Sequence, residues 1–237
     1  MTESHVIEAN EAVNRVNSVL TGLKAKVQYV REKLLEWYKK NGRSYPWRTT
    51  DDPYKILIAE IMLRRTRADQ VLPVYNNFVR CYPTVKALAE GEEESIEKLT
   101  YSLGLHWRNQ ELGDLARHII SKYQGEIPKS RDELMEIPGV GQYVAGVLLS
   151  SAYNKKEWIV DTNVIRVFSR FFGLRIKGDG RRNKEVIMIA KQFVDCENPR
   201  QANFAVIDFA ALICRKINPL HSRCPISWEC AYYDRHR

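Results

Sequence analysis

Apolar residues recur every three or four positions along most of the chain, and this pattern predicts an all-α protein. No segment alternates apolar and polar residues as a half-buried strand would. The first residues are polar with a weak helical pattern, which indicates a polar N-terminal leader over 1–23. Beyond it, helices are expected over 24–41, 54–66, 71–82, 85–89, 94–101, 110–123, 130–137, 144–151, 164–171, 184–194 and 201–213.

A Gly-rich hairpin separates two short helices near the middle of the chain. Ser130 and Glu133 form a capping box that begins the first helix, and Pro138 ends it. Gly139 and Gly141 can take positive φ angles, so the hairpin leaves N–H groups and a helix N-terminus uncovered. Such an arrangement binds phosphate, although a plain packing corner between two helices would have the same pattern.

Two carboxylates occupy unusual places in the predicted helices. Glu60 lies within an apolar helix, where a carboxylate costs free energy unless it is paired or used, and burial would raise its pKa. An ion pair with Arg48, Arg64 or Arg65 is the structural alternative to a catalytic role. Asp161 directly precedes another apolar helix, and its commoner role at such a place is the N-cap.

The chain is basic, with a formal net charge of +8 and a pI of about 9.2. This excess of Lys and Arg favours a polyanionic partner. No apolar run approaches the ~20 residues that a membrane span needs. The N-terminus is polar and mixed in charge, unlike a secretory signal. We therefore expect an intracellular protein, in the cytoplasm or nucleoid, whose thiols stay reduced.

Three of the five cysteines, Cys214, Cys224 and Cys230, lie together near the C-terminus, whereas Cys81 and Cys196 stand alone. In a reducing compartment this cluster predicts metal or iron–sulfur ligation rather than disulfides.

Asp161, the acid that precedes an apolar helix, follows the hairpin by about twenty residues. This combination resembles the helix-hairpin-helix DNA glycosylases of the endonuclease III and adenine glycosylase superfamily, over Tyr45 to Tyr233. Arg65, Leu105 and Tyr143 resemble in particular the Mig-type thymine–guanine mismatch glycosylases.

The resemblance implies two helical lobes with the active-site cleft between them. One is a six-helix barrel domain over 52–152 that ends in the helix-hairpin-helix. The other is an iron–sulfur domain built from both ends of the chain, 24–51 and 153–237.

The resemblance also implies catalytic roles. Asp161 would stabilise a cationic sugar and guide water, and Glu60 would protonate or hydrogen-bond the departing base or position water. Tyr143 stands where strand-cutting members carry the lysine that forms a Schiff base, which implies a monofunctional enzyme in which Tyr143 packs on the sugar or base. Lys155 and Lys156 lie nearby in sequence, so weak strand cleavage stays open.

Other residues fall at positions that touch DNA in this family. Asn163 would orient Asp161 or the backbone, or serve as a helix cap. The rest are Trp47 and Arg48 against the base pocket, Arg65 and Thr66 in the gap left by the extruded base, Leu103 and Leu105 in the duplex wedge, and Gly139 and Gly141 on the DNA backbone.

The family's iron–sulfur loop has four cysteines separated by six, two and five residues. Here Cys214, His221, Cys224 and Cys230 keep these intervals, with histidine at the second place. The resemblance therefore implies a [4Fe–4S] cluster with Cys3His ligation, with zinc as the alternative. A degenerate site with His221 on the surface is the structural alternative.

These features predict a monofunctional DNA glycosylase that removes thymine or uracil opposite guanine and leaves an abasic site. One alternative is an adenine glycosylase acting opposite guanine or 8-oxoguanine, and another is a non-catalytic protein that binds damaged DNA. The expected partner is double-stranded DNA with a mismatch. We expect the protein to bind it as a monomer, and we expect no membrane partner.

Overall fold

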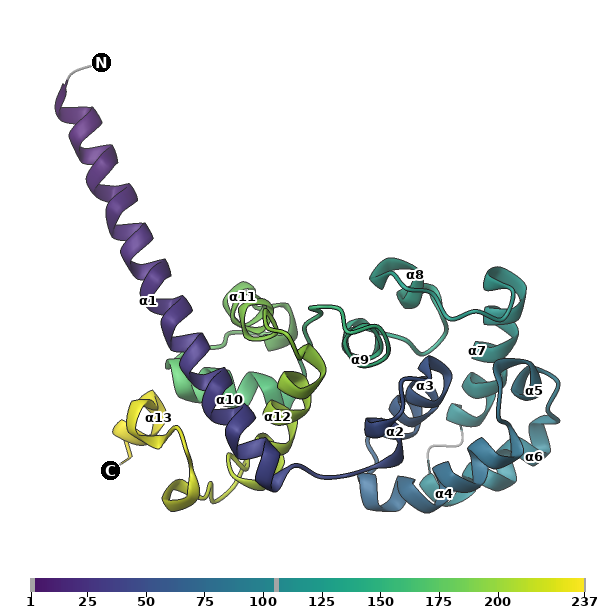
Figure 1. The fold of residues 1–237 in the computed structure, drawn as a ribbon. Coiled ribbons are helices and arrows are strands. Elements are labelled where there is room, and N and C mark those ends of the chain that lie inside the picture. The colour runs from purple at the N-terminus through teal and green to yellow at the C-terminus, as the bar shows by residue number, and fades with distance from the viewer. Residues whose placement is uncertain (1–2, 105–106, 237) are drawn as a thin grey trace.

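The computed structural model describes the backbone of residues 3–104 and 107–236, and the side chains of 21–104 and 111–236. The all-α prediction is confirmed, since no β-strand occurs in these ranges (Figure 1). The helices are α1 (Glu3–Asn41), α2 (Pro46–Thr49), α3 (Pro53–Met62), α4 (Ala68–Cys81), α5 (Val85–Ala89), α6 (Glu93–Thr100), α7 (Trp107–Tyr123), α8 (Arg131–Glu136), α9 (Gln142–Ala152), α10 (Thr162–Phe172), α11 (Lys184–Phe193), α12 (Pro199–Leu212) and α13 (Ala231–Asp234). Four short 3-10 helices are η1 (Tyr101–Leu103), η2 (Gly180–Arg182), η3 (His221–Arg223) and η4 (Ser227–Glu229).

The first helix begins much earlier than its apolar pattern predicts. The expected start at Lys24 was wrong, because α1 is one continuous helix from Glu3 to Asn41 (Figure 1). The preceding segment contains no proline, and most of its residues are compatible with a helix. Its apolar residues are sparse, but Val13, Val16 and Leu20 continue the three-and-four spacing of the later part of α1, which is consistent with one continuous helix. No helix of the described residues is long and apolar enough to cross a membrane.

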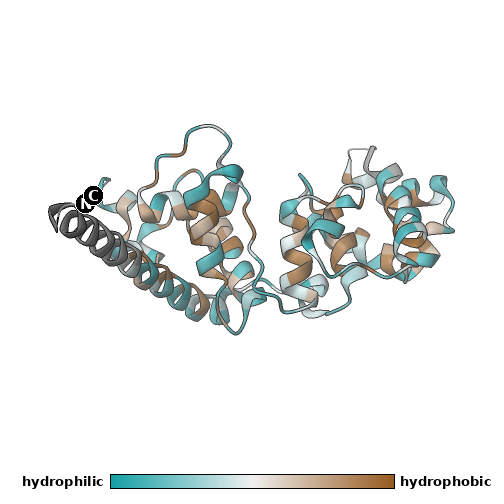
Figure 2. Cartoon of the chain, turned by 90° about the horizontal axis from the view of Figure 1, so that it is seen from above, coloured by the Kyte–Doolittle hydropathy of each residue, from teal (hydrophilic) through white to brown (hydrophobic). Residues whose placement is uncertain are grey.

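The helices form two lobes, as Figures 1 and 2 show from two directions. Helices α2 to α8 lie in one lobe, and α1 packs against α11 and α12 in the other, which therefore combines both ends of the chain. Helix α9 contacts α3 on one side and α12 on the other. The lobes thus meet at α9, while the exact boundaries 52–152, 24–51 and 153–237 stay a prediction.

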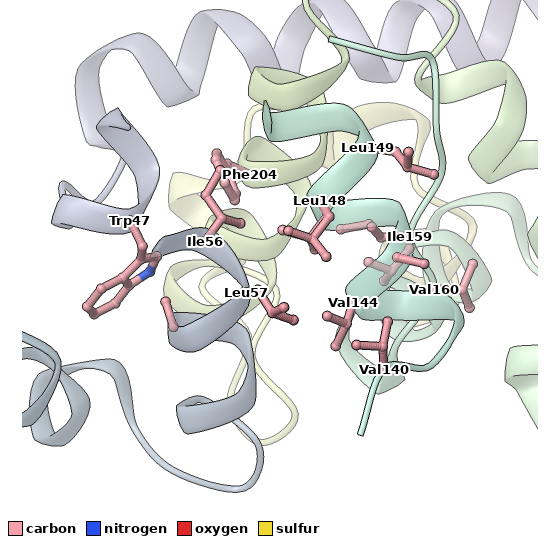
Figure 3. Packing of buried hydrophobic residues seen from close by; sticks show 14 of the residues in the cluster. Trp47, Ile56, Leu57, Val140, Val144, Leu148, Leu149, Ile159, Val160 and Phe204 are labelled. Atoms are coloured by element: carbon pink, nitrogen blue, oxygen red, sulfur yellow. The ribbon is translucent and has the colours of Figure 1, made fainter. Parts of the chain in front are cut away.

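The core between α3 and α9 holds the site residues in place. Helix α3 begins where Asp52 Oδ1 accepts a hydrogen bond from Tyr54 N at 2.9 Å, and its residues are apolar on nearly every side. Figure 3 shows Ile56 and Leu57 of this helix near Leu148 of α9. A helix that is apolar all round is buried, and this burial encloses its one carboxylate as well.

The predicted helix-hairpin-helix is present as α8, a turn and α9. Ser130 begins α8 by accepting a hydrogen bond from Glu133 N. Gly139 has φ +80°, as expected for the turn, whereas Gly141 is the N-cap of α9 with an extended backbone at φ −110°. Only Gly139 therefore uses the left-handed region that glycine favours.

Gly146 of α9 permits the closest packing in this part of the fold. A Cβ atom there would overlap the carbonyl oxygen of Trp158. We therefore expect Gly146→Ala to lower the free energy of unfolding by about 1–3 kcal/mol, measured by urea denaturation. Gly22→Ala is the matched control, because Gly22 lies inside α1 with open space around it. That substitution should raise stability by up to about 1 kcal/mol. Equal stability of the two variants would contradict the packing argument.

Candidate active site between the two lobes

A cavity of about 410 Å³ lies between the lobes. This volume falls in the range of ~300–1,000 Å³ typical of small-molecule sites. Its wall combines residues of α2, α3, α9, α10 and α12, so both lobes are needed to form it. The predicted site residues that line it are Trp47, Arg48, Glu60, Thr66, Tyr143, Asp161 and Asn163.

Asp161 is the N-cap of α10 and also faces this cavity. Its Oδ1 accepts hydrogen bonds from the backbone N–H groups of Asn163, at 2.9 Å, and Val164, at 2.8 Å. Its Oδ2 accepts one from Asn163 Nδ2 at 2.7 Å. The capping role and a chemical role are therefore compatible, because capping uses Oδ1 and leaves acceptor capacity on Oδ2.

Asn163 is itself held in one orientation by Arg166. Arg166 Nη2 donates to Asn163 Oδ1 at 3.1 Å, and its Nε donates to the carbonyl oxygen of Cys214 at 2.8 Å. A guanidinium only donates, so the amide oxygen of Asn163 faces Arg166 and its amide nitrogen faces Asp161. The position of the Asp161 carboxylate is therefore fixed from both sides.

Glu60 lies in the last turns of α3 and is only 6% exposed. Burial raises its pKa, the positive charge of Arg48 opposes this and the negative charge of Asp161 adds to it, so that the pKa of Glu60 is about 7. Among the described residues, none forms an ion pair or hydrogen bond with the Glu60 carboxyl group. Arg48 instead pairs with Asp208, and Arg64 with Glu111 at 2.6 Å. The sequence alternative of a Glu60–arginine pair is thus not realised there.

Tyr143, in the first turn of α9, is the third candidate catalytic residue at this cavity. Burial raises the pKa of its phenol well above the ordinary value, and the negative charges of Glu60 and Asp161 act in the same direction. The phenol therefore stays protonated near neutral pH and can donate a hydrogen bond into the cavity.

Asp208 is a site residue that the sequence patterns did not single out. It lies on α12 with a fully buried side chain and contacts Arg43 and Arg48, which both line the cavity. Burial alone would raise the pKa of Asp208, but the hydrogen bonds and charges of these arginines hold it below the ordinary value. One signal was available: Asp208 is an acid inside an apolar helix, the same anomaly that identified Glu60.

Of the other residues predicted to touch DNA, Arg65, Leu103, Gly139 and Gly141 do not line this cavity. Arg65 is exposed with a left-handed backbone at φ +60°, and Leu103 is half-buried against the core. Gly139 and Gly141 lie in the hairpin, and Leu105 lies outside the described residues. Trp47 is buried and stacks on Tyr45, with ring centroids 4.8 Å apart.

The four predicted metal ligands, Cys214, His221, Cys224 and Cys230, line one cavity beside α10 and the end of α12. Burial raises the pKa of Cys224 to about 12, and Arg170 Nη1 donates to Cys214 Sγ at 3.6 Å. In the ranges that the structure describes, no three potential ligands are close enough to hold a single metal ion. Three thiols and an imidazole are donors that either an iron–sulfur cluster or zinc accepts.

The comparisons with known proteins agree with this geometry. A model of the HhH-GPD superfamily of base excision DNA repair proteins matches residues 58–194. A thymine-DNA glycosylase of Aeropyrum pernix is 38% identical over 216 residues, which cover 89% of this chain and 97% of that protein. A thymine/uracil-DNA glycosylase of Pyrobaculum aerophilum is 36% identical, with 86% and 92% covered.

The solved structure of a thermostable thymine-DNA glycosylase superposes with a TM-score of 0.83 at 33% identity, covering 89% of this chain and 98% of that one. A trapped endonuclease III–DNA covalent intermediate has the same fold, with a TM-score of 0.76 at 24% identity over 90% of this chain and 98% of that one. The family model covers more than half of the chain, and the curated relatives align along most of both lengths. This protein therefore belongs to the HhH-GPD superfamily of base excision DNA repair proteins.

Proposed function

We propose that this protein is a monofunctional DNA glycosylase that removes thymine or uracil mispaired with guanine and leaves an abasic site. The observation that carries the proposal is the meeting of Asp161, Glu60 and Tyr143 in one cavity between the lobes. The names of the relatives, thymine-DNA and thymine/uracil-DNA glycosylases, support the choice of base.

The chemistry follows from the three side chains. The target nucleotide has to leave the duplex, because its glycosidic carbon is shielded in the stack. As the bond to the base breaks, the sugar becomes cationic, and the Asp161 carboxylate stabilises this charge from a fixed position. A water molecule then bonds to the sugar carbon and gives up a proton to the carboxylate, which leaves the abasic sugar. Glu60, with a pKa of about 7, holds a proton for the departing base. The phenol of Tyr143 packs beside the base and donates a hydrogen bond.

Duplex DNA with a mismatch is the partner that we propose, bound by one copy of the protein. Gly139 and Gly141 would hold the DNA backbone. Arg65 and Thr66 would occupy the space of the extruded base, with Leu103 as part of the wedge. The net charge of +8 supports binding to the phosphate backbone.

The test is single-turnover excision on labelled duplexes that carry T·G, U·G, A·G or A·8-oxoguanine, each treated with and without alkali. Alkali-dependent product from T·G or U·G alone is expected. Product from the adenine strands alone would assign the protein to adenine excision instead. Binding without any product would favour the non-catalytic alternative.

The absence of an amine at position 143 leads to a further prediction. Tyr143→Lys should place a primary amine beside the sugar and so introduce strand cleavage without alkali. Borohydride should then trap a covalent protein–DNA adduct, detected as a mass increase that the parent protein does not give. Alkali-independent cleavage by the parent itself would show that another lysine, such as Lys155 or Lys156, already acts as the nucleophile.

We propose that Cys214, His221, Cys224 and Cys230 hold a [4Fe–4S] cluster. The shared cavity of these four residues supports this, and the Arg170 guanidinium partly offsets the rise in the pKa of the Cys214 thiol that burial causes. The purified protein should contain iron and acid-labile sulfide in equal amounts, and Cys224→Ser should lose both and melt at a lower temperature. Zinc without sulfide would establish the alternative ion, and neither metal would establish a degenerate site.

A further inference from the structure

Asp208 joins two arginines into one rigid unit on the wall of the cavity. Its Oδ1 accepts from Arg43 Nε at 2.8 Å and from Arg48 Nη2 at 2.9 Å. Its Oδ2 accepts from the Arg43 backbone N–H at 2.7 Å and from Arg48 Nη1 at 2.8 Å. Arg48 Nη1 also donates to the carbonyl oxygen of Arg43 at 3.2 Å. The three residues therefore move together, with a combined charge of +1.

Aromatic rings fix the same unit from its sides. The Arg48 guanidinium lies 4.6 Å from the ring centroid of Phe204 and 5.5 Å from that of Tyr45. The Arg43 guanidinium lies 5.8 Å from the Tyr45 ring. The backbone carbonyl oxygen of Arg48 accepts a hydrogen bond from Arg200 Nη2 at 2.7 Å, which further restrains Arg48. The orientation of these donors is consequently set before any base enters.

This wall of the cavity offers hydrogen-bond donors but few acceptors. Both Asp208 oxygens accept at least two hydrogen bonds and the side chain is fully buried, so little acceptor capacity remains. Each guanidinium has five N–H donors and no acceptor. The contacts of Arg43 to Asp208 engage its Nε and Nη2, which leaves further N–H donors on a residue that lines the cavity.

The exocyclic group on C4 of a pyrimidine, or on C6 of adenine, distinguishes the candidate bases. Thymine and uracil carry the acceptor O4 there, whereas cytosine and adenine carry an amino group that donates. We propose that Asp208 is a positioning residue that fixes Arg43 and Arg48 as donors to the O4 oxygen of the extruded base, and so selects thymine and uracil against bases with an exocyclic amine. This inference rests on the proposed function of the cavity and adds the means of base selection.

The test compares two bases, each opposite guanine: uracil and pyrimidin-2-one, which lacks the O4 oxygen of uracil and also its N3 proton. The measured quantity is the single-turnover excision rate of uracil divided by that of pyrimidin-2-one. It is measured in the parent and in the variants Asp208→Asn and Arg43→Gln. The two bases also differ in intrinsic leaving-group reactivity, but this difference is the same for every protein. Comparing the ratio between proteins therefore cancels it. Arg67→Gln is the matched control, because Arg67 lines the same cavity and loses the same charge but contacts Asp69, not Asp208.

The parent ratio should fall by about 10–100-fold in both Asp208→Asn and Arg43→Gln, the loss expected for a hydrogen bond to a charged donor. Arg67→Gln should keep the parent ratio. Asp208→Asn breaks a buried ion pair and is destabilising, so Arg43→Gln, whose side chain is 30% exposed, decides the outcome if the first variant does not fold.

An unchanged ratio in Arg43→Gln, with a parent protein active on uracil, would overturn the positioning role alone. An equal fall in Arg67→Gln would also overturn it, because charge rather than a fixed donor would then be responsible. A parent protein that excises adenine, or no base at all, would overturn the proposed function and the selection mechanism with it.

Discussion

Replacing Asp161 with Asn should slow excision of uracil opposite guanine by about 10²–10³-fold or more, while duplex binding and thermal stability stay close to those of the parent. Asparagine has nearly the same shape and is also a good N-cap, so α10 keeps its first turn. Only the negative charge is lost, and this charge is what stabilises the cationic sugar. Single-turnover kinetics measure the loss, and fluorescence anisotropy with a labelled duplex measures binding.

Asp179→Asn is the control for this experiment. Asp179 caps η2, where its Oδ1 accepts from Arg181 N at 3.1 Å, and it does not line the cavity. The two variants remove the same charge from the same kind of position in the fold, so excision should fall only in Asp161→Asn. Equal excision by both variants would mean that Asp161 is a helix cap and nothing more.

Replacing Glu60 with Gln should slow excision by about 10²-fold or more. It should also remove the decrease in excision rate that the parent shows at high pH. In the parent, Glu60 has a pKa of about 7 and must be protonated to give its proton to the base. Parent excision should therefore decrease as the pH rises through about 7, while the variant stays slow throughout. A parent rate that increases over this range would instead make Glu60 the base that activates water.

The same group should affect stability, with a sign that the raised pKa sets. Between the ordinary value of 4.5 and about 7, the folded protein binds a proton at Glu60 that the unfolded chain has lost. The free energy of unfolding should therefore decrease as the pH rises across this window. Urea denaturation at several pH values should show this decrease in the parent and a smaller one in Glu60→Gln.

Local sequence patterns were sufficient for most of the helices but not for their spatial pairing. Helix α5 has the predicted bounds, 85–89, and most others differ by a few residues, because periodic apolar faces and caps are local signals. The start of α1 was missed, although Val13, Val16 and Leu20 continue its apolar spacing, because polar residues dominate this part of the sequence. Leu63 illustrates a smaller shift: α3 ends before it, although the apolar run continues.

The candidate site was predicted in part for the same reason. Glu60 and Asp161 stand out locally, as an acid in an apolar helix and an acid at a helix start. Tyr143 was identified only through the family resemblance, at the place where strand-cutting members carry a lysine. The role of Asp208 was missed because Arg43 lies 165 positions away in the chain. No local pattern reports such a contact, and only the folded lobes bring the two residues together.

The joining of both chain ends in one lobe has a consequence for biosynthesis. Arg43 leaves the ribosome early but finds Asp208 only after 165 more residues have been added. At ~5–20 residues per second this takes on the order of ten to thirty seconds. During this time the cavity still lacks the wall from α12. The complete wall of this cavity can therefore form only after α12 has been synthesised, and a chain that stops before Asp208 lacks the carboxylate that holds Arg43 and Arg48.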